Sequence, residues 1–342
     1  MSWSIKELDE VKGFTVEWGD SEIYILSRLN KLYVSKNLER PFKHMYTFRT
    51  SGILSLLSHL RILQRFFRFM FYNVIKLPTG GIFVTFQKQA GLYKEGKFHP
   101  VKGMDRPSRF LRGACAVDQA GGVYLGEYLS NPDRGPVKIY YLPPDSIQLE
   151  VVYEFQSHMI RHIHGLFYDQ YEDCIWCTSG DMEKECKILK TNDSFVTVEL
   201  VGEGDETWRT VSVLFTEDGI YYGMDGQFCQ NYIYRIDRKT KERTQLSKVD
   251  GPVYYSKKID GRLFFGVTAE GCPSQSENVA SLWCVSHDGQ VERVIGYGKD
   301  FLPNRVFMPG TIHFTLGPER DNKLLLYCLG LKGVDGKTLQ IT

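Results

Sequence analysis

One recurring pattern limits the fold of this chain more than any other feature. A turn containing Gly, Asp or Asn precedes a short strand that alternates aromatic and β-branched residues. The copies are spaced by roughly 40 to 60 residues, close to the period of propeller blades. The seven copies lie in RLNKLYVSK near Asn30, PTGGIFVTFQ near Gly81, QAGGVYLGEY near Gly122, YEDCIWCTSGD near Asp173, TEDGIYYGMD near Gly219, KIDGRLFFGVT near Gly261 and RDNKLLLYCLG near Asn322.

The repeat predicts an all-β chain that forms a single β-propeller over residues 1–342, with seven blades. In the fifth unit, TVSVLFT, GIYYGMD, NYIYRID and ERTQLSK supply four antiparallel strands. The C-terminal unit offers only HFTLG, LLLYCLG and TLQIT, so we expect an N-terminal strand near FTVEWG to complete that blade and close the ring. Six blades is the alternative, because the first and last units are the weakest matches.

Residues 51–72 break the pattern and predict a helical insertion between the first two blades. Their sequence, SGILSLLSHLRILQRFFRFMFY, has a helical period, with Arg61, Arg65 and Arg68 on one face and Leu, Ile and Phe on the others. One interpretation is a helix packed across a face or edge of the propeller. The alternative is a basic amphipathic helix that makes peripheral contact with a membrane surface.

Charge and hydropathy exclude several classes of protein. Lys and Arg number 42 and Asp and Glu 41, so the formal charge of +1 argues against a bulk electrostatic partner of nucleic acid. No apolar run is long enough for a transmembrane helix. The N-terminus lacks a basic region followed by an apolar run, so we expect a cytoplasmic protein with reduced cysteines. Cys174 and Cys177 form a CxxC inside a strand-like run, which favours packing over metal or redox chemistry.

Propellers gather functional side chains at one mouth of the central channel, from positions far apart in sequence. The strongest candidate is IRHIHGLFYD, in which His162 and His164 lie two apart and therefore point to one face of a strand. Such a pair can bind a divalent metal or act in general acid–base catalysis. The alternative is one buried, hydrogen-bonded histidine and one surface histidine.

Two further segments place polar and aromatic residues beside repeat strands. In GEYLSNPDR, Glu127 or Tyr128 could serve as a catalytic acid, and a polar turn is the alternative interpretation. In DETWRTVSVLF, Arg209 could clamp an anionic group and Trp208 could stack on a sugar. The alternative there is a surface ion pair, with the Trp packed between blades.

Three more candidates for binding substrate come from the fifth and sixth units. Asp225 follows a strand in GMDGQF, and Asp181 holds the equivalent place one unit earlier. A repeated Asp there can also cap the turn between strands. Tyr254 in GPVYYS and Glu270 in GVTAEG complete the set.

Four segments together resemble the bacterial sialidase-like, BNR-repeat-related propeller proteins, over roughly residues 70 to 340. They are GGVYLGEYLSNP, IRHIHGLFYDQYEDCIWCTSGD, WRTVSVLFTEDGIYYGMD and NYIYRIDRKT. The resemblance implies a carbohydrate ligand without fixing a reaction. The chain lacks the SxDxGxTW sequence of true sialidases, so sialidase activity itself is not expected.

Two functional hypotheses follow. The first is a carbohydrate-active propeller, either a glycoside hydrolase or a polysaccharide lyase, whose candidate side chains converge at one channel mouth. The second is a non-catalytic propeller that binds a glycan or protein partner. It predicts a channel filled by apolar or mutually paired side chains, and an exposed apolar patch elsewhere.

Overall fold

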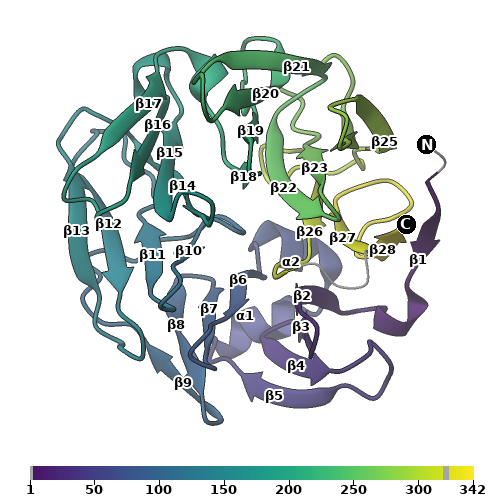
Figure 1. Cartoon of the computed structure of the whole chain (residues 1–342). Helices are drawn as coiled ribbons and strands as arrows, with labels where there is room; N and C mark the ends of the chain where they lie inside the picture. Colours follow the sequence, from purple (N-terminus) through teal and green to yellow (C-terminus); the bar gives the residue numbers. More distant parts are fainter. Residues whose placement is uncertain (1–2, 319–322) are drawn as a thin grey trace.

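The chain forms a ring of seven four-stranded antiparallel sheets around a central channel (Figure 1). The computed structural model describes residues 3–318 and 323–342. The sheets follow one another along the chain, each running from an innermost to an outermost strand. The structure confirms the predicted all-β propeller with seven blades, and the six-bladed alternative is wrong.

The strands of the first four blades, each from the inside outward, are as follows. They are β2 (Thr15–Gly19), β3 (Tyr24–Arg28), β4 (Lys31–Ser35) and β5 (Lys43–Thr47); β6 (Phe71–Lys76), β7 (Ile82–Phe86), β8 (Gln89–Lys94) and β9 (Lys97–Pro100); β10 (Ala116–Val117), β11 (Val123–Gly126), β12 (Val137–Leu142) and β13 (Glu150–Phe155); β14 (His162–Asp169), β15 (Cys174–Gly180), β16 (Lys187–Thr191) and β17 (Glu199–Glu203).

The remaining three blades follow the same order. They are β18 (Val213–Phe215), β19 (Gly219–Gly223), β20 (Asn231–Asp237) and β21 (Arg243–Val249); β22 (Val253–Ile259), β23 (Arg262–Val267), β24 (Val279–Val285) and β25 (Val291–Gly298); β26 (Thr311–Phe314), β27 (Leu324–Leu329), β28 (Thr338–Ile341) and β1 (Ile5–Glu7). Three short 3-10 helices lie outside the sheets, at Asp9–Val11, Glu183–Glu185 and Glu206–Trp208.

The N-terminus closes the ring, but with a different strand from the one predicted. The outermost strand of the seventh blade is β1, where Ile5 pairs with Ile341 and Glu7 with Leu339. The expected strand, FTVEWG, instead becomes β2, the innermost strand of the first blade. Its central residues are buried, whereas β1 is largely exposed and carries no apolar alternation that would mark it in the sequence.

Five of the repeated turns identified in the sequence occupy the same place in their blades. The turns near Gly81, Gly122, Asp173, Gly219 and Gly261 each join the innermost strand of a blade to its second strand. The turn near Asn30 instead joins the second and third strands of the first blade. The turn near Asn322 lies partly outside the described residues.

The core lies between neighbouring blades, and close approach there depends on glycines at the ends of second strands. A Cβ on Gly126 would lie 2.4 Å from Ile163 of the next blade, and one on Gly223 would lie 2.5 Å from Val253. Real Cβ atoms do not approach other heavy atoms this closely. Glycine therefore sets how closely successive sheets pack around the channel.

The cysteines are free thiols, and the CxxC does not form a paired site. Cys174 and Cys177 both lie in β15 and are buried. Cys177 packs in the cluster shared with the third blade, and Cys174 packs in the cluster shared with the fifth. They face opposite sides of the sheet, as an odd spacing in a strand requires.

The helical insertion consists of two six-residue helices, α1 (Gly52–Leu57) and α2 (Arg61–Phe66), rather than one continuous helix. Ser51 caps α1, its side chain accepting the Leu54 N–H at 3.2 Å. Residues 71 and 72 belong to β6. The three arginines also do not share one face. Arg61 and Arg65 bind Asp335 and Asp300 on the propeller, whereas Arg68 lines the channel pocket described below.

A buried ion pair ties the third blade to the first. Arg112, just before β10, binds the carboxylate of Glu17 in β2, and both side chains are 2% exposed. Arg112 also donates to the backbone oxygen of Phe314 in the seventh blade. This one side chain therefore connects three blades. The residue before it in the chain, Leu111, lines the pocket described below.

Candidate functional site

The channel mouth at which the innermost strands begin holds a cavity of about 540 Å³, lined by residues of blades two to six. This volume lies within the range of about 300–1,000 Å³ usual for small-molecule sites. Side chains reach the cavity from two equivalent positions in each blade. Those at or shortly before an innermost strand are Arg68, Arg109, His162, Arg209 and Tyr254, and those just after a second strand are Lys88, Tyr128, Asp181, Asp225 and Glu270.

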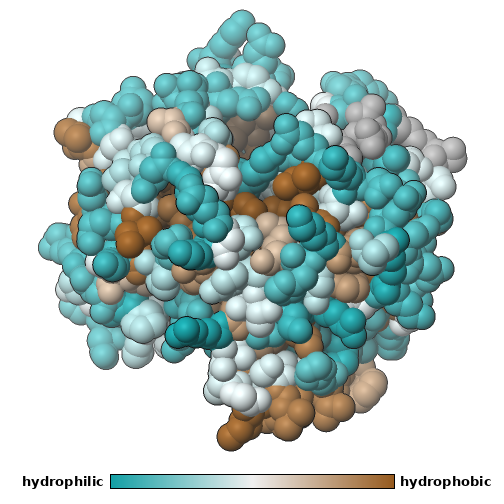
Figure 2. Space-filling model, turned by 90° about the horizontal axis from the view of Figure 1, so that it is seen from below, coloured by the Kyte–Doolittle hydropathy of each residue, from teal (hydrophilic) through white to brown (hydrophobic). Residues whose placement is uncertain are grey.

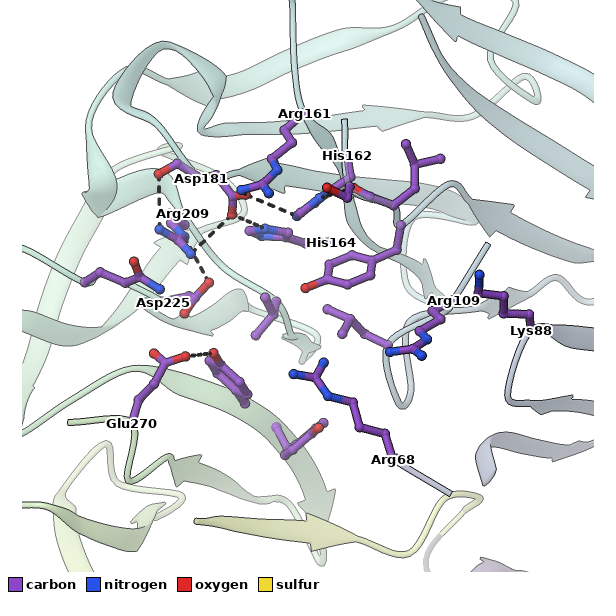
Figure 3. Close-up of a pocket in the computed structure, with 18 of the residues that line it drawn as sticks. Arg68, Lys88, Arg109, Arg161, His162, His164, Asp181, Arg209, Asp225 and Glu270 are labelled. Carbon is purple, nitrogen blue, oxygen red and sulfur yellow. Dashed lines mark hydrogen bonds and ion pairs between the residues drawn. The ribbon is translucent and has the colours of Figure 1, made fainter. Parts of the chain in front are cut away.

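Charge is divided across this pocket. Blades two and three supply Arg68, Lys88 and Arg109, whereas blades four to six supply the acidic residues Asp181, Asp225 and Glu270 (Figure 3). In the part of the chain that the structure describes, none of the three cations has an ion-pair partner. The pocket therefore offers unneutralised positive charge on one wall, which suits an anionic group of a ligand.

His162 and His164 share the hydrogen-bonding pattern of metal-binding imidazoles. The Nδ1 atom of His162 lies 3.0 Å from the Leu129 oxygen, and that of His164 lies 3.1 Å from the Thr210 oxygen. A carbonyl oxygen only accepts hydrogen bonds, so each Nδ1 carries the proton. In the neutral rings, both Nε2 atoms then present lone pairs, as metal ligands do.

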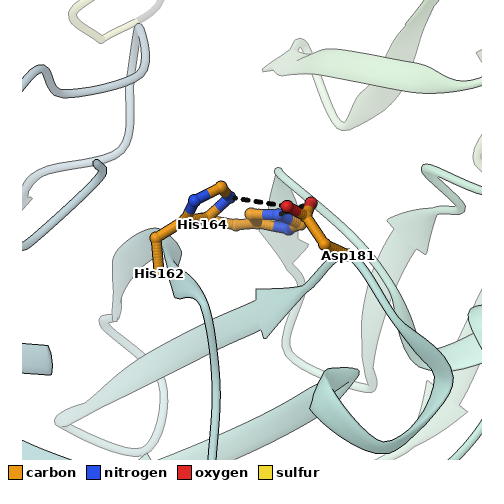
Figure 4. Close-up of side chains that lie close together, drawn as sticks. All are labelled: His162, His164 and Asp181. Carbon is orange, nitrogen blue, oxygen red and sulfur yellow. Dashed lines mark ion pairs between the residues drawn. The ribbon is translucent and has the colours of Figure 1, made fainter. Parts of the chain in front are cut away.

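Both Nε2 atoms face the carboxylate of Asp181 (Figure 4). The distances are 3.6 Å from His162 and 3.5 Å from His164, and the ligand atoms of the three residues all lie within 4.8 Å of one another. The Nε2 of His162 is buried without a hydrogen-bond partner. Lone pairs facing a carboxylate repel it, so a proton or a metal cation between the groups would stabilise this arrangement. Arg161 and Arg209 also bind the carboxylate, at 2.9 and 3.3 Å.

Burial disfavours the protonated form of His164. Burial is the main cause that lowers the pKa of His164, to about 4, so this ring is neutral at pH 7. Burial alone would raise the pKa of Asp181, but hydrogen bonds and charge from the two imidazoles in their protonated form outweigh it and lower that pKa below its ordinary value, so Asp181 is ionised. The backbone of Asp181 has a φ of 135°, a conformation that favours glycine. Such strain is typical of functional sites.

Asp225 is a buried carboxyl group with a free oxygen. Arg209 Nε donates to its Oδ2 at 2.9 Å, while its Oδ1 is buried with no hydrogen-bond partner. Burial raises the pKa of Asp225 from 3.8 to about 7, although Arg209 opposes the shift. A carboxyl group with this pKa can hold a proton near neutral pH and donate it.

Two tyrosines and a glutamate complete the polar lining. The Tyr254 hydroxyl donates to Glu270 Oε1 at 2.5 Å, and Glu270 Oε2 is buried without a partner. The Tyr128 ring lies 4.2 Å from the His162 ring, centroid to centroid. Burial raises the pKa of Tyr128 to about 12, so its hydroxyl stays protonated at neutral pH. Both hydroxyls are therefore hydrogen-bond donors.

The structure thus brings seven of the nine predicted site residues to one pocket: Tyr128, His162, His164, Arg209, Asp225, Tyr254 and Glu270. Glu127, the residue after β11, lies outside it, because successive residues of extended backbone point to opposite sides. Its buried carboxylate binds Arg106 and accepts the Lys138 N–H, so Glu127 is not placed to act as the catalytic acid.

Trp208 also lies outside the pocket, where it packs between blades. Its ring covers Gly202, and the Arg243 guanidinium lies 3.8 Å from its centroid. Trp208 is therefore not placed to stack on a sugar in this pocket. Arg209 lines the pocket, but its guanidinium already binds Asp181 and Asp225. That side chain orients carboxylates rather than presenting free charge.

The sequence pattern places Arg68 on the face of a predicted helix and does not mark Lys88 and Arg109, although all three remain available as cations in the pocket. The signal that could have found them is position within the repeat, since Lys88 follows a second strand as Asp181 and Asp225 do.

In the other group of possible metal ligands among the described residues, an arginine occupies both oxygens of the aspartate. The group comprises Asp169, Glu172 and Cys174. Arg238 donates to both oxygens of Asp169, at 2.7 and 2.9 Å, and lies 3.0 Å from Glu172. This group therefore serves as a structural ion pair.

The fold and the pocket define a seven-bladed propeller with a polar, charge-divided site at one channel mouth. No family model and no curated protein sequence matches the chain. The comparisons therefore support the propeller fold but not the particular sialidase-like family.

Solved structures similar to the chain are propellers with about one tenth of residues identical. An oligogalacturonate lyase in complex with manganese aligns with a TM-score of 0.64 at 10% identity, over 99% of this chain and 90% of that one. The extracellular domain of a putative one-component system from B. thetaiotaomicron aligns with a TM-score of 0.60 at 11% identity, over 98% of this chain and 39% of that one. YCF48 bound to D1 peptide aligns with a TM-score of 0.57 at 11% identity, over 99% and 96%.

Proposed function

We propose that this protein is a carbohydrate-active enzyme that cleaves an acidic oligosaccharide in the channel-mouth pocket. The observation that carries the proposal is the division of charge across the cavity, with Arg68, Lys88 and Arg109 facing a wall of histidines and carboxylates. An acidic sugar carries a negative charge that the basic wall can bind, and its hydroxyls can donate hydrogen bonds to the carboxylates of the acidic wall. A structural neighbour that acts as an oligogalacturonate lyase supports this substrate class through fold likeness alone.

His162, His164 and Asp181 are the residues that would hold a divalent cation. Two imidazoles and one carboxylate suit a divalent transition metal, and the partnerless Nε2 of His162 fits this role. A bound cation would neutralise the carboxylate of a sugar acid and so ease removal of the neighbouring proton. The same structural neighbour was solved with manganese.

We assign the proton transfers of an elimination to two carboxyl groups of the other wall. Glu270, with its free Oε2, takes the proton from the carbon next to the sugar carboxylate. A carbon–carbon double bond forms as the bond to the glycosidic oxygen breaks. Asp225, whose pKa near 7 leaves it partly protonated, gives a proton to the departing oxygen. Hydrolysis, in which water adds across the bond, is the alternative reaction.

The test is turnover of oligogalacturonate, with neutral malto-oligosaccharide as the matched control. We expect a rise in ultraviolet absorbance from the new double bond, and loss of that rise in Asp225→Asn and in Arg68→Ala/Arg109→Ala. New reducing ends without the absorbance rise would identify a hydrolase. Binding of the acidic sugar without turnover would favour the non-catalytic glycan-binding propeller, and the absence of binding would refute the proposal.

A further inference from the structure

The helical insertion exposes an apolar surface that the fold leaves uncovered. Ile53 and Leu56 of α1 are 76% and 73% exposed, Leu60 before α2 is 59% exposed, and Ile62 and Phe66 of α2 are also exposed. Figure 2 shows hydrophobic residues projecting from the lower edge of the molecule, the side of the ring on which α1 and α2 lie behind the blades in Figure 1. We call these five residues, together with Phe301 and Val306, the apolar ridge.

Phe301 and Val306 come from the connection between β25 and β26, beside the helices. Phe301 is 89% exposed, and it shares a surface groove with Ile62 of α2. The rings of Phe66 and Phe307 lie 5.9 Å apart, which joins this connection to α2. Two connections far apart in sequence therefore build one contiguous exposed apolar surface, unlike the single exposed apolar residues that are normal on a protein surface.

The polypeptide around the ridge is strongly basic. Residues 49–70, 299–310 and 330–336 together contain seven arginines and lysines against two aspartates, Asp300 and Asp335. Both aspartates are already bound, to Arg65 and Arg61 respectively. In the described part of the chain, Arg49, Arg305 and Lys332 have no ion-pair partner. This local excess contrasts with the net charge of +1 for the whole chain.

The ridge lies on the same face of the propeller as the pocket. Both connections that build it lead into innermost strands, β6 and β26, as do the segments that carry Arg109 and Arg209 into the pocket. Arg68, two residues after α2, belongs to the pocket lining itself. A surface that contacts the ridge would therefore also approach the channel mouth.

We propose that the apolar ridge docks this protein on an anionic lipid bilayer, with the channel mouth facing the membrane surface. A projecting apolar edge can enter the boundary between headgroups and acyl chains, and the surrounding cations complement anionic headgroups. The two helices are too short to cross a bilayer, and no helix in the described ranges has the length and hydropathy of a membrane span. The contact is therefore peripheral.

The test is co-sedimentation of the full chain with vesicles. We expect binding to vesicles of equal parts phosphatidylcholine and phosphatidylglycerol, weaker binding to phosphatidylcholine alone, and release by high salt. Leu56→Glu/Phe66→Glu should lower the partition coefficient at least about tenfold, because both side chains lose their apolar contact. The matched control is Val196→Glu, since Val196 is 83% exposed in the connection between β16 and β17, which lies on the opposite face.

The same variants separate the alternatives. Thermal unfolding should show that all variants fold, because the substituted side chains are exposed. Equal loss of binding in the Val196 control would overturn the proposal. A wild-type protein that binds neither kind of vesicle would also overturn it. A wild-type dimer that the double substitution converts to a monomer, measured by light scattering, would instead assign the ridge to a second copy of the chain.

Discussion

Glu17 and Arg112 lie 95 positions apart in the chain, yet they form a fully buried ion pair between the first and third blades. The Ser27 hydroxyl donates to the other oxygen of Glu17, so both carboxylate oxygens are satisfied. The pair shows how the ring is held across its channel as well as between neighbouring sheets.

Removing one member of this pair should destabilise the fold strongly. We expect Glu17→Ala to lower the free energy of unfolding by about 3–5 kcal/mol, because it leaves the Arg112 charge buried and uncompensated. Glu7→Ala breaks the more exposed pair with Lys337 and should cost no more than about 1 kcal/mol. Denaturant unfolding measures both, and equal effects would contradict a structural role for the buried pair.

Close packing between blades can be tested at a single glycine. Gly126→Ala places a Cβ 2.4 Å from Ile163, so a neighbouring strand must shift. We expect a loss of about 1–3 kcal/mol in the free energy of unfolding. Gly52→Ala adds a Cβ that meets nothing within 4 Å and should leave stability nearly unchanged. A loss in Gly52→Ala as large as that in Gly126→Ala would refute the explanation.

The candidate metal site predicts a ligand-dependent rise in thermal stability. Manganese, added as the ion alone, should raise the unfolding midpoint of the wild type, since it binds the folded state preferentially. His162→Ala/His164→Ala should abolish the rise. Asp181→Asn should also abolish it, because the variant lacks the carboxylate ligand; the lost ion pairs with Arg161 and Arg209 should lower stability in the absence of metal as well. A rise that persists in both variants would place the metal elsewhere.

Ionisation of Asp225 predicts a particular pH dependence of stability. Its pKa is about 7 in the folded state against an ordinary 3.8, so the folded state binds the extra proton between these values. The stability that this proton contributes is present at acidic pH and is lost as the pH rises through 7.

We therefore expect Asp225→Asn to gain stability relative to the wild type as the pH rises from about 4 to about 7, by at most about 1.4 kcal/mol for each pH unit, with no further gain above that. Unfolding at several pH values measures this difference. Asp133→Asn, at an exposed position, is the control. Parallel pH profiles for the wild type and Asp225→Asn would show that burial does not hold the proton on this group.

For each of the two functional hypotheses drawn from the sequence, the structure contains one of the expected features. The channel mouth is polar and gathers most candidate residues, as expected for a carbohydrate-active site. The exposed apolar patch of the second hypothesis is present as well, on α1 and α2. The two features lie on one face, so they are compatible within a single molecule.

Local sequence was sufficient to predict the number of blades, the four strands of the fifth blade and a helical insertion near residues 51–72, of which 52–57 and 61–66 are helical. These features repeat or alternate within short windows, and burial of one face of each strand follows from that alternation. The prediction of which strand closes the ring is wrong, because β1 is an exposed outer strand. Its pairing with β28 depends on the position of the C-terminal strand in the folded ring.

The composition of the site was decided by tertiary structure. Glu127 and Tyr128 are adjacent in the segment that follows β11, but only Tyr128 faces the pocket, because successive residues of extended backbone point to opposite sides. Arg68, Lys88 and Arg109 gained their role only when ring closure set them opposite Asp181 and Asp225. The sequence by itself determined the repeating unit, whereas the charge-divided pocket exists only where five such units meet, since the basic side chains come from blades two and three and the acidic ones from blades four to six.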